Sequence, residues 1–220
     1  MKGRRAVLRP ESTMFFVFEG IDGCGKSTQA RLLQKHLKET RALDALLLRE
    51  PGGTQLGEKL RDLVLNPRWG DLAAETELFI FMAARSHLIR TRILPALASG
   101  RVVISDRFLW SSVVYQGLAA GILPREIFRI GRLALAGVKA TRIFVLDVDP
   151  RTAFGRVKRR NRMEERGIAF QERVRQGFLS LAERFPRRGV VIEGRGSPED
   201  VHARVIARLP KHGWSQCSSR

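Results

Sequence analysis

The stretch of the chain that decides its fold is FVFEGIDGCGKST, residues 16–28. Within it, Gly20-Ile21-Asp22-Gly23-Cys24-Gly25-Lys26-Ser27 has the spacing GxxxxGK[ST], after an apolar run and before a segment rich in Leu, Gln and Lys. Glycines at these places let successive backbone N–H groups point at phosphate oxygens, and the N-terminus of the following helix adds partial positive charge. The pattern predicts a strand, a phosphate-binding loop and a helix. An ordinary glycine-rich turn would not require the Lys-Ser pair, so we favour nucleotide binding.

The residues of this loop have distinct expected roles. Lys26 is expected to reach the β and γ phosphates, and the Ser27 hydroxyl to ligate Mg²⁺. We expect Cys24 to fill space rather than to act as a redox or catalytic thiol. The segment expected to bind ATP is Gly20, Ile21, Asp22, Gly23, Cys24, Gly25, Lys26, Ser27 and Thr28. The loop motif alone does not separate kinases from GTPases or motors, although the sequence has no NKxD-type guanine signature.

Working outward, short apolar runs alternate with longer amphipathic stretches. The runs are residues 14–18, 45–48, 101–105, 141–148 and 189–193, and the expected helices are about 26–39, 54–66, 72–98, 110–136, 150–185 and 198–208. None of the runs alternates between polar and apolar residues, which is typical of strands buried on both faces of a parallel sheet. The alternation predicts one α/β domain with a five-stranded parallel sheet flanked by helices. Its expected limits are 14–209, with a basic extension at 1–13 and a tail at 210–220.

The charge balance raises a second interpretation. Forty Lys and Arg against 22 Asp and Glu in 220 residues give a formal net charge of +18. This excess excludes an acidic disordered segment, and it makes nucleic acid, phosphate or an anionic membrane surface conceivable partners. A basic nucleic-acid-binding P-loop ATPase is therefore the alternative from another class. It predicts a continuous basic stripe on the surface and binding that weakens steeply with salt.

The cysteines and apolar runs bear on the compartment. Cys24 and Cys217 are the two cysteines and show no zinc-type spacing, which fits a reduced, cytoplasmic setting. The longest uncharged run, residues 108–124, is broken by polar residues and is too short for a membrane span. The basic N-terminus lacks the apolar segment of a signal peptide. We therefore expect a cytoplasmic protein without a membrane anchor.

A second polar constellation, Asp106-Arg107, follows the run 101–105. In a parallel sheet, the carboxyl end of this strand faces the same crevice as the phosphate loop. A carboxylate there can hold Mg²⁺ or orient the attacking oxygen, and an Arg beside it can neutralise a phosphate in transfer. A surface Asp-Arg pair without function is the alternative for these two residues taken alone.

Several further segments, in their order and spacing along the chain, favour the functional interpretation of Asp106-Arg107. They are Arg49-Glu50-Pro51-Gly52-Gly53-Thr54, Phe81-Met82-Ala83-Ala84-Arg85, Asp106-Arg107-Phe108 leading through Ser111 to Tyr115-Gln116-Gly117, Leu146-Asp147-Val148-Asp149-Pro150, and Arg162-Met163-Glu164. With the phosphate loop, they closely resemble the bacterial thymidylate kinase family from about residue 14 to 209. The resemblance implies a nucleoside monophosphate kinase-like P-loop NTPase fold. It also implies transfer of the γ-phosphate of Mg·ATP to dTMP, giving dTDP and ADP in dTTP synthesis, by a homodimer that needs no nucleic acid.

The resemblance also assigns residues to the substrate. The expected dTMP-binding set is Asp22, Arg49, Phe81, Arg85, Arg107, Ser111, Tyr115 and Gln116. In the family, the ring at Phe81 stacks on thymine, and the Arg at Arg85, four residues on and so on the same helix face, hydrogen-bonds the pyrimidine carbonyl edge. Phe79 and Phe81 lie in one apolar stretch, so either ring could instead belong to the core. A kinase for another nucleoside monophosphate is the nearest alternative.

The remaining members of the set contact the sugar, the phosphates and the base. Family resemblance places Asp22 by the deoxyribose 3′-hydroxyl, Tyr115 where it excludes a ribose 2′-hydroxyl, and Gln116 against the base. Arg49 and Arg107 are expected to clamp phosphates, with Arg107 near the acceptor monophosphate, because a guanidinium chelates phosphate oxygens in a fork.

An arginine-rich stretch is expected to form a lid over ATP at about residues 151–166. One branch of the family carries an Arg inside the phosphate loop, where this chain has Gly23 and Cys24. The branch without it carries the catalytic Arg in the lid, and the sequence does not rank its candidates, Arg159, Arg160 and Arg162. With Lys26, Asp106 and Arg107, these arginines complete the expected catalytic set, and Ser27 and Asp106 are the expected metal ligands.

Replacing Arg159, Arg160 and Arg162 together with Ala tests the lid assignment. Since an arginine supplied to the transferring phosphate contributes roughly 10³–10⁵ in rate, turnover should collapse while dTMP still binds. Steady-state kinetics and a dTMP binding titration measure the two effects. Near-normal turnover in this variant would refute the assignment.

Overall fold

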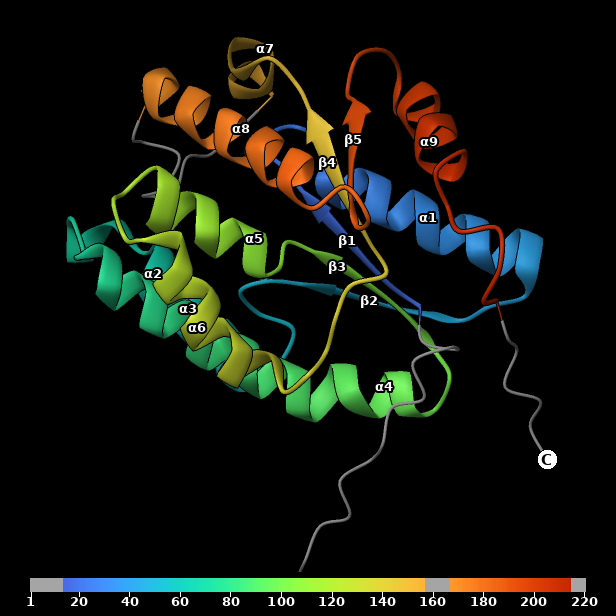
Figure 1. The fold of residues 1–220 in the computed structure, drawn as a ribbon, viewed down its shortest axis with the longest axis horizontal. Coiled ribbons are helices and arrows are strands. Elements are labelled where there is room, and N and C mark those ends of the chain that lie inside the picture. The colour runs from blue at the N-terminus through green and yellow to red at the C-terminus, as the bar shows by residue number, and fades with distance from the viewer. Residues whose placement is uncertain (1–13, 157–166, 215–220) are drawn as a thin grey trace, which may run out of the picture.

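A parallel five-stranded sheet forms the centre of the molecule (Figure 1), and the computed structural model describes residues 14–156 and 167–214. The strands are β1 (Phe15–Glu19), β2 (Ala45–Arg49), β3 (Val102–Asp106), β4 (Arg142–Asp147) and β5 (Gly189–Glu193). Their order in the sheet is β2-β3-β1-β4-β5, and every neighbouring pair is parallel. The predicted α/β fold with a five-stranded parallel sheet is confirmed.

Strand β1 lies in the middle of the sheet and is the most deeply buried. Phe15, Phe16, Val17 and Phe18 have no exposed surface, as expected of an apolar run covered on both faces. In register, Phe18 lies beside Asp106 of β3, and Glu19 lies beside Val145 of β4. The carboxyl ends of β1 and β3, which carry the two polar motifs of the sequence, therefore meet at one edge of the sheet.

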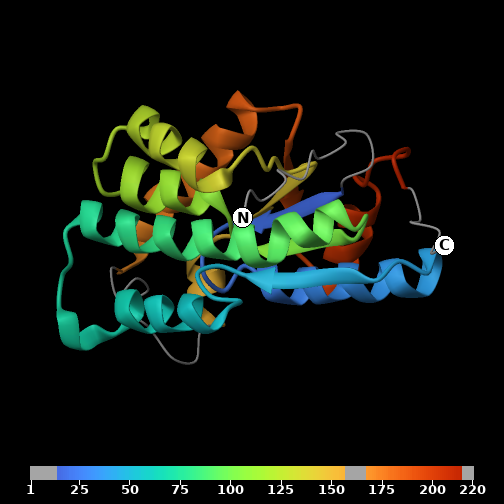
Figure 2. The same cartoon turned by 90° about the horizontal axis from the view of Figure 1, so that it is seen from below.

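Helices cover both faces of the sheet (Figures 1 and 2). On one face lie α1 (Lys26–Arg41) and α9 (Pro198–Ile206), and on the other α3 (Ala74–Leu88), α4 (Leu94–Ala98), α5 (Leu109–Ser112) and α8 (Gly167–Arg184). Outside these, α2 (Gln55–Leu65) and α6 (Pro124–Leu135) pack on α3, and α7 (Pro150–Gly155) packs on α8. A 3₁₀ turn, Pro67–Trp69, follows α2. Among the described residues, no helix is long and apolar enough to cross a membrane.

Two of the helices expected from the sequence contain π-helical segments. Ile89–Ile93 joins α3 to α4 in one rod (Figure 2), so the helix expected at 72–98 is nearly continuous. There the backbone N–H of Leu94 donates to the oxygen of Ile89, because Pro95 interrupts the regular pattern with a residue that lacks an N–H.

The helix expected at 110–136 is wrong as a single element. After the π-helical segment Val113–Leu118 the chain turns, and α6 starts at Pro124. Gly121 has φ +99°, a left-handed conformation that glycine adopts without strain. Pro124 then opens the new helix at a position where its missing N–H costs nothing.

The expected segments at the ends of the chain and the lid fall largely outside the described residues. The extension 1–13, residues 157–166 and residues 215–220 are among them. Within the described part of the tail, Trp214 stacks on Phe16 at 5.7 Å between ring centroids, and the Arg41 guanidinium lies 4.2 Å from its ring. The tail therefore packs on the domain at least as far as Trp214.

A buried carboxylate at the end of β1 organises the loop after β3. Glu19 has no exposed surface, and it accepts hydrogen bonds from the backbone N–H groups of Phe108 at 2.9 Å and Ser111 at 3.1 Å. It also accepts the Ser111 hydroxyl at 2.6 Å. Burial raises the pKa of Glu19 to about 7, although the hydrogen bond from Ser111 and the charge of Arg107 oppose that rise. Arg107, next to this anchor, has φ +71°, which a non-glycine residue rarely adopts.

Replacing Glu19 with Gln should alter how stability depends on pH. The pKa of Glu19 is about 7 in the fold and about 4.5 ordinarily, so the folded state holds the proton more tightly. The wild-type protein therefore loses stability as pH rises from about 4.5 through 7, by up to roughly 3 kcal/mol from this group. Because Gln has no charge to desolvate, the stability of wild type relative to E19Q should be higher at pH 5 than at pH 8. Urea unfolding at both pH values measures it, and an unchanged difference would contradict the assignment.

Candidate active site

Two adjoining cavities open at the carboxyl edge of the sheet, where open α/β sheets bind ligands. The outer cavity has a volume of about 600 Å³ and the inner one about 120 Å³. Four residues line both cavities: Asp22, Glu50, Arg61 and Arg107. A group passing from one cavity to the other would therefore meet two guanidinium groups and two carboxylates at the boundary.

The phosphate loop forms the floor of the outer cavity. Asp22, Gly23, Cys24, Gly25, Lys26, Ser27 and Thr28 line it, together with Arg49 and Asp106. Gly20 and Ile21 of the expected ATP-binding segment lie below, with Ile21 only 1% exposed, and their carbonyl oxygens accept the Lys26 ammonium at 3.1 and 2.7 Å. The loop thus folds around its own lysine.

Glycine is required at the start of this loop by space and by backbone conformation. Gly20 has φ +138°, and a Cβ on it would lie 2.8 Å from the Sγ of Cys24 and 2.8 Å from the carbonyl oxygen of Leu146. Cys24 is buried, and burial raises the pKa of its thiol above the ordinary value. The thiol therefore stays protonated and packs against the loop, in agreement with a space-filling role.

Ser27 and Asp106 come together across the outer cavity, from α1 and the end of β3. The Ser27 hydroxyl donates a short hydrogen bond to the Asp106 carboxylate. Hydroxyl and carboxylate oxygens are the hard ligands that Mg²⁺ prefers, and this ion is commonly held by one or two protein oxygens plus substrate phosphates. The pair therefore fits Mg²⁺. Within residues 14–156 and 167–214, no three His, Cys, Asp or Glu side chains form a metal cluster.

Arg107 connects the phosphate loop to the inner cavity. Its guanidinium pairs with the Asp22 carboxylate and also donates to the Gly20 carbonyl at 3.3 Å and the Ser111 hydroxyl at 3.0 Å. Burial by itself would raise the pKa of Asp22, but the charges of Arg107 and Lys26 outweigh it and lower that pKa. Burial also raises the pKa of Tyr115, whose hydroxyl lies 3.3 Å from Asp22. The site thus holds an ionised carboxylate, a guanidinium and a neutral phenol.

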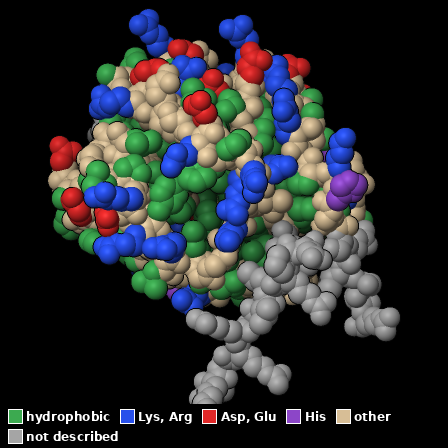
Figure 3. Space-filling model, in the orientation of Figure 1, with side chains coloured by type: hydrophobic (Ala, Val, Ile, Leu, Met, Phe, Trp, Pro, Cys, Tyr) green, Lys and Arg blue, Asp and Glu red, His purple; other side chains and the backbone are tan. Residues whose placement is uncertain are grey.

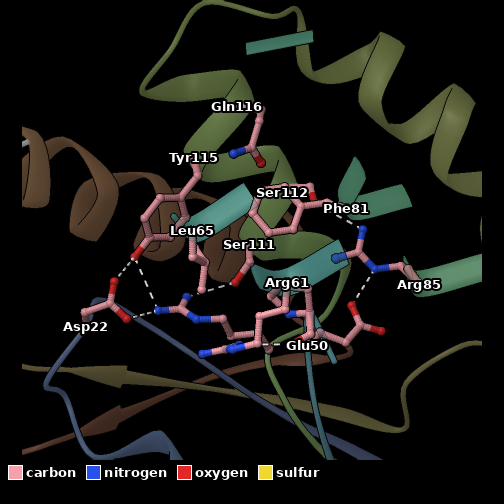
Figure 4. A pocket seen from close by; sticks show the side chains of 12 residues that line it. Asp22, Glu50, Arg61, Leu65, Phe81, Arg85, Ser111, Ser112, Tyr115 and Gln116 are labelled. Carbon is pink, nitrogen blue, oxygen red and sulfur yellow. Dashed lines mark hydrogen bonds and ion pairs between the residues drawn. The ribbon is translucent and has the colours of Figure 1, made fainter. Parts of the chain in front are cut away.

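The inner cavity is narrow and has an aromatic wall. Its lining residues are Asp22, Glu50, Pro51, Arg61, Leu65, Phe81, Arg85, Arg107, Ser111, Ser112, Tyr115 and Gln116. Phe81 is half-buried and its ring borders the cavity (Figure 4). Phe79 is 60% exposed and does not line the cavity. Of the two rings that the sequence left as alternatives, Phe81 is the one placed to stack on a flat ligand.

Arg85 is buried and held firmly from three sides. Its Nε donates to Glu50 Oε2 at 2.6 Å, Nη1 to the Ser112 hydroxyl at 3.1 Å, and Nη2 to the Phe108 carbonyl at 2.9 Å. Burial raises the pKa of Glu50, while the charge of Arg85 opposes that rise. Nη1 also donates to the Met82 Sδ at 3.3 Å. Because a guanidinium has five N–H donors, one remains for a ligand in the cavity, and these contacts fix its direction.

Arg49 differs in being 57% exposed and turned toward α2. Its guanidinium pairs with Glu58 at 3.0 Å, at the rim of the outer cavity. The Arg expected to clamp phosphate is thus at the site but bound to a carboxylate. The lid candidates Arg159, Arg160 and Arg162 lie outside the described residues. Of the loop after β5, Gly194, Gly196 and Ser197 line the outer cavity.

Several site residues are absent from the set drawn from the sequence. Arg61 lines both cavities and donates to the Pro51 carbonyl at 2.9 Å, and Glu50 holds Arg85. Glu77 is fully buried and accepts the Gln116 amide at 2.9 Å. A charged residue inside an apolar stretch was the available signal for Glu19 in FFVFEG and Glu77 in ELFIFM, whereas Arg61 carried none.

Comparison with known proteins agrees with this arrangement. The family model described as thymidylate kinase matches residues 18–205. A thymidylate kinase from Caldanaerobacter subterraneus subsp. tengcongensis is 39% identical over 200 residues, covering 90% of this chain and 95% of the relative. One from Kosmotoga olearia is 41% identical over 196 residues, covering 88% of this chain and 93% of the relative.

A solved structure extends the likeness to the fold. The crystal structure of thymidylate kinase from Ehrlichia chaffeensis superposes with a TM-score of 0.74 at 34% identity, covering 89% of this chain and 98% of that one. The expected resemblance to this family is therefore confirmed. With a phosphate loop and an Asp-Arg pair meeting at one sheet edge beside an aromatic-walled cavity, the chain belongs to the thymidylate kinase family.

Proposed function

We propose that this protein phosphorylates dTMP to dTDP with Mg·ATP as donor, as a step of dTTP synthesis in the cytoplasm. The observation that carries the proposal is the shared boundary of the two cavities, where Arg107 and Asp22 stand between the phosphate loop and the aromatic pocket. A donor phosphate in the outer cavity and an acceptor phosphate from the inner one would meet at this boundary. Such an arrangement serves transfer between two bound nucleotides.

In the outer cavity, ATP would lie with its phosphates on the N–H groups of the phosphate loop. Lys26 is close enough to turn from its carbonyl partners toward the β and γ phosphates. Ser27 and Asp106 would hold Mg²⁺, and the bound ion supplies neutralisation of phosphate charge.

In the inner cavity, dTMP would lie with its base against Phe81. Arg85 would donate to a carbonyl of the pyrimidine, while Tyr115 and Asp22 close the space around the sugar. The acceptor phosphate would extend toward Arg107 and Ser111, which already hydrogen-bond each other at 3.0 Å. Since Arg107 is fixed by Asp22 and the Gly20 carbonyl, its guanidinium is oriented before the substrate arrives.

The proposed chemistry needs no strong general base, because a phosphate monoester is already nucleophilic at neutral pH. Catalysis then consists of alignment and charge stabilisation. Lys26 and the lid arginines, with Arg159, Arg160 and Arg162 as candidates, would stabilise charge on the transferred group. Arg49 would exchange Glu58 for phosphate, and closing the lid would keep water from the γ-phosphate.

Turnover of a panel of nucleoside monophosphates with Mg·ATP tests the proposed function. We expect dTMP to be the preferred acceptor and chelation of Mg²⁺ to abolish turnover, since Ser27 and Asp106 are suited to the ion. Coupled detection of ADP measures the rates. Fast turnover of dUMP, CMP or AMP with none on dTMP would sink the substrate assignment, and ATP hydrolysis stimulated only by nucleic acid would favour the alternative class.

We also propose that two copies of the chain form a homodimer through α3 and α6. These helices pack on each other and leave large apolar side chains uncovered, Phe79 at 60% and Leu133 at 80% exposure. Exposed apolar side chains on adjacent helices are typical of a self-complementary interface.

Replacing Phe79 with Lys should shift this dimer toward monomer, because a buried unpaired charge at an interface is costly. The matched control is Ile168→Lys on α8, which is 43% exposed in a different part of the surface. Size-exclusion chromatography with light scattering gives the mass of each. Wild-type protein that is monomeric, or an F79K variant that remains as dimeric as I168K, would contradict the proposed interface.

A further inference from the structure

A buried carboxylate, Glu77 on α3, lies behind the inner cavity and has no role in the proposed binding of ATP or dTMP. It has no exposed surface, and its Oε2 accepts a hydrogen bond from the side-chain Nε2 of Gln116 at 2.9 Å. Gln116 is itself 1% exposed and lines the cavity. A charged residue is rarely this buried without a specific partner. The pair therefore joins the back of α3 to the part of the chain that faces the base.

The contact determines which way the Gln116 amide faces. An amide presents a donor on one side and an acceptor on the other, whereas an ionised carboxylate only accepts. The Glu77 carboxylate therefore attracts the NH₂ group of Gln116 and repels its carbonyl oxygen. The amide as a whole is directed toward the ring of Phe81 (Figure 4). With one N–H held by Glu77, the amide is oriented so that its acceptor Oε1 lies on the side away from Glu77, where it is available to a ligand.

Glu77 belongs to a row of residues on α3 that serves the same cavity. Phe81 follows it by four residues and Arg85 by eight, a spacing that places side chains along one side of a helix. Arg85 presents a donor whose direction is fixed by its contacts with Glu50 and Ser112. The cavity thus has a flat wall, an oriented donor and an oriented acceptor.

We propose that Glu77 is a positioning residue for base selection, which locks the Gln116 amide so that its oxygen accepts the N3–H of thymine. This inference rests on the proposed function, since it requires dTMP in the inner cavity. Thymine has a donor at N3 beside carbonyl acceptors, whereas cytosine has an acceptor at N3 and an amino donor at C4. An acceptor held at N3 therefore favours thymine and repels cytosine, and a freely flipping amide would accept either base.

Replacing Glu77 with Gln tests the lock with minimal change in volume. A carboxamide at 77 can either accept from or donate to Gln116, so both orientations of the Gln116 amide become available. The measured quantity is the Ki of dCMP divided by the KM of dTMP. Losing the orientation of one buried hydrogen bond should lower this ratio at least about tenfold, while the KM of ATP changes less than about twofold.

The matched control is Glu75→Gln, the same chemical change at an exposed position of the same helix. This variant should keep the wild-type ratio. An unchanged ratio in E77Q, or equal loss of affinity for dTMP and dCMP, would overturn the proposal, because a purely structural role weakens both nucleotides alike. Absence of dTMP turnover in the wild-type enzyme would instead refute the proposed function, so the two failures are distinguishable.

Should E77Q fail to fold, the wild-type protein still decides the question by NMR. The side-chain NH₂ protons of Gln116 are assigned by their loss in Gln116→Leu. The proton that is hydrogen-bonded to Glu77 should keep its chemical shift when dTMP is added, and the other should gain no bond to the base. If dTMP moves these protons by an amount typical of a new hydrogen bond, the NH₂ group contacts the base. That outcome would overturn the proposal.

Discussion

The ion pair between Arg107 and Asp22 is the interaction on which the arrangement of the site depends. It joins the end of β3 to the phosphate loop, and Arg107 makes it from an unusual left-handed backbone conformation. Glu19 stabilises that conformation from below by taking the N–H groups of Phe108 and Ser111. Buried charges are tolerated only when paired and hydrogen-bonded. The charged side chains of Arg107, Asp22 and Glu19 therefore depend on these contacts. Removing any one of them leaves another buried and incompletely satisfied.

Buried carboxylates shape this site more than the basic composition suggests. Glu19, Glu50 and Glu77 are each almost fully buried and each orients a group that faces a cavity: the loop of Arg107, the guanidinium of Arg85 and the amide of Gln116. The net charge of +18 is only partly explained by the site. Lys and Arg side chains also occur across the face shown in Figure 3, with acidic side chains between several of them.

The fold was predictable because its signals are local. Apolar runs without polar alternation identify the strands, and the phosphate loop places β1 before α1. The expectation of burial on both faces holds for β1, β3 and β4 but is wrong for β2 and β5, which are partly exposed. The supporting carboxylates were not predictable in the same way, since Glu19 acts on Ser111, 92 residues away, and Glu77 on Gln116, 39 residues away. The interruption of the helix before α6 was missed because Gly121 and Pro124 act jointly in a stretch that otherwise has helical periodicity. The choice between Phe79 and Phe81 required knowing which side of α3 faces the inner cavity.

The π-helical segment Val113–Leu118 carries two consecutive residues, Tyr115 and Gln116, that both line the inner cavity. In a regular α-helix, neighbouring side chains diverge by about 100°, so consecutive side chains reach a shared space from different directions. A π-helical turn is wider, with more residues per turn, and such turns occur frequently at functional sites. Here Tyr115 turns toward Asp22, while Gln116 turns toward Glu77 and Phe81. The irregular helix thus places a phenol and an amide on adjacent residues of one cavity, and the carboxylates opposite them determine how each side chain is oriented.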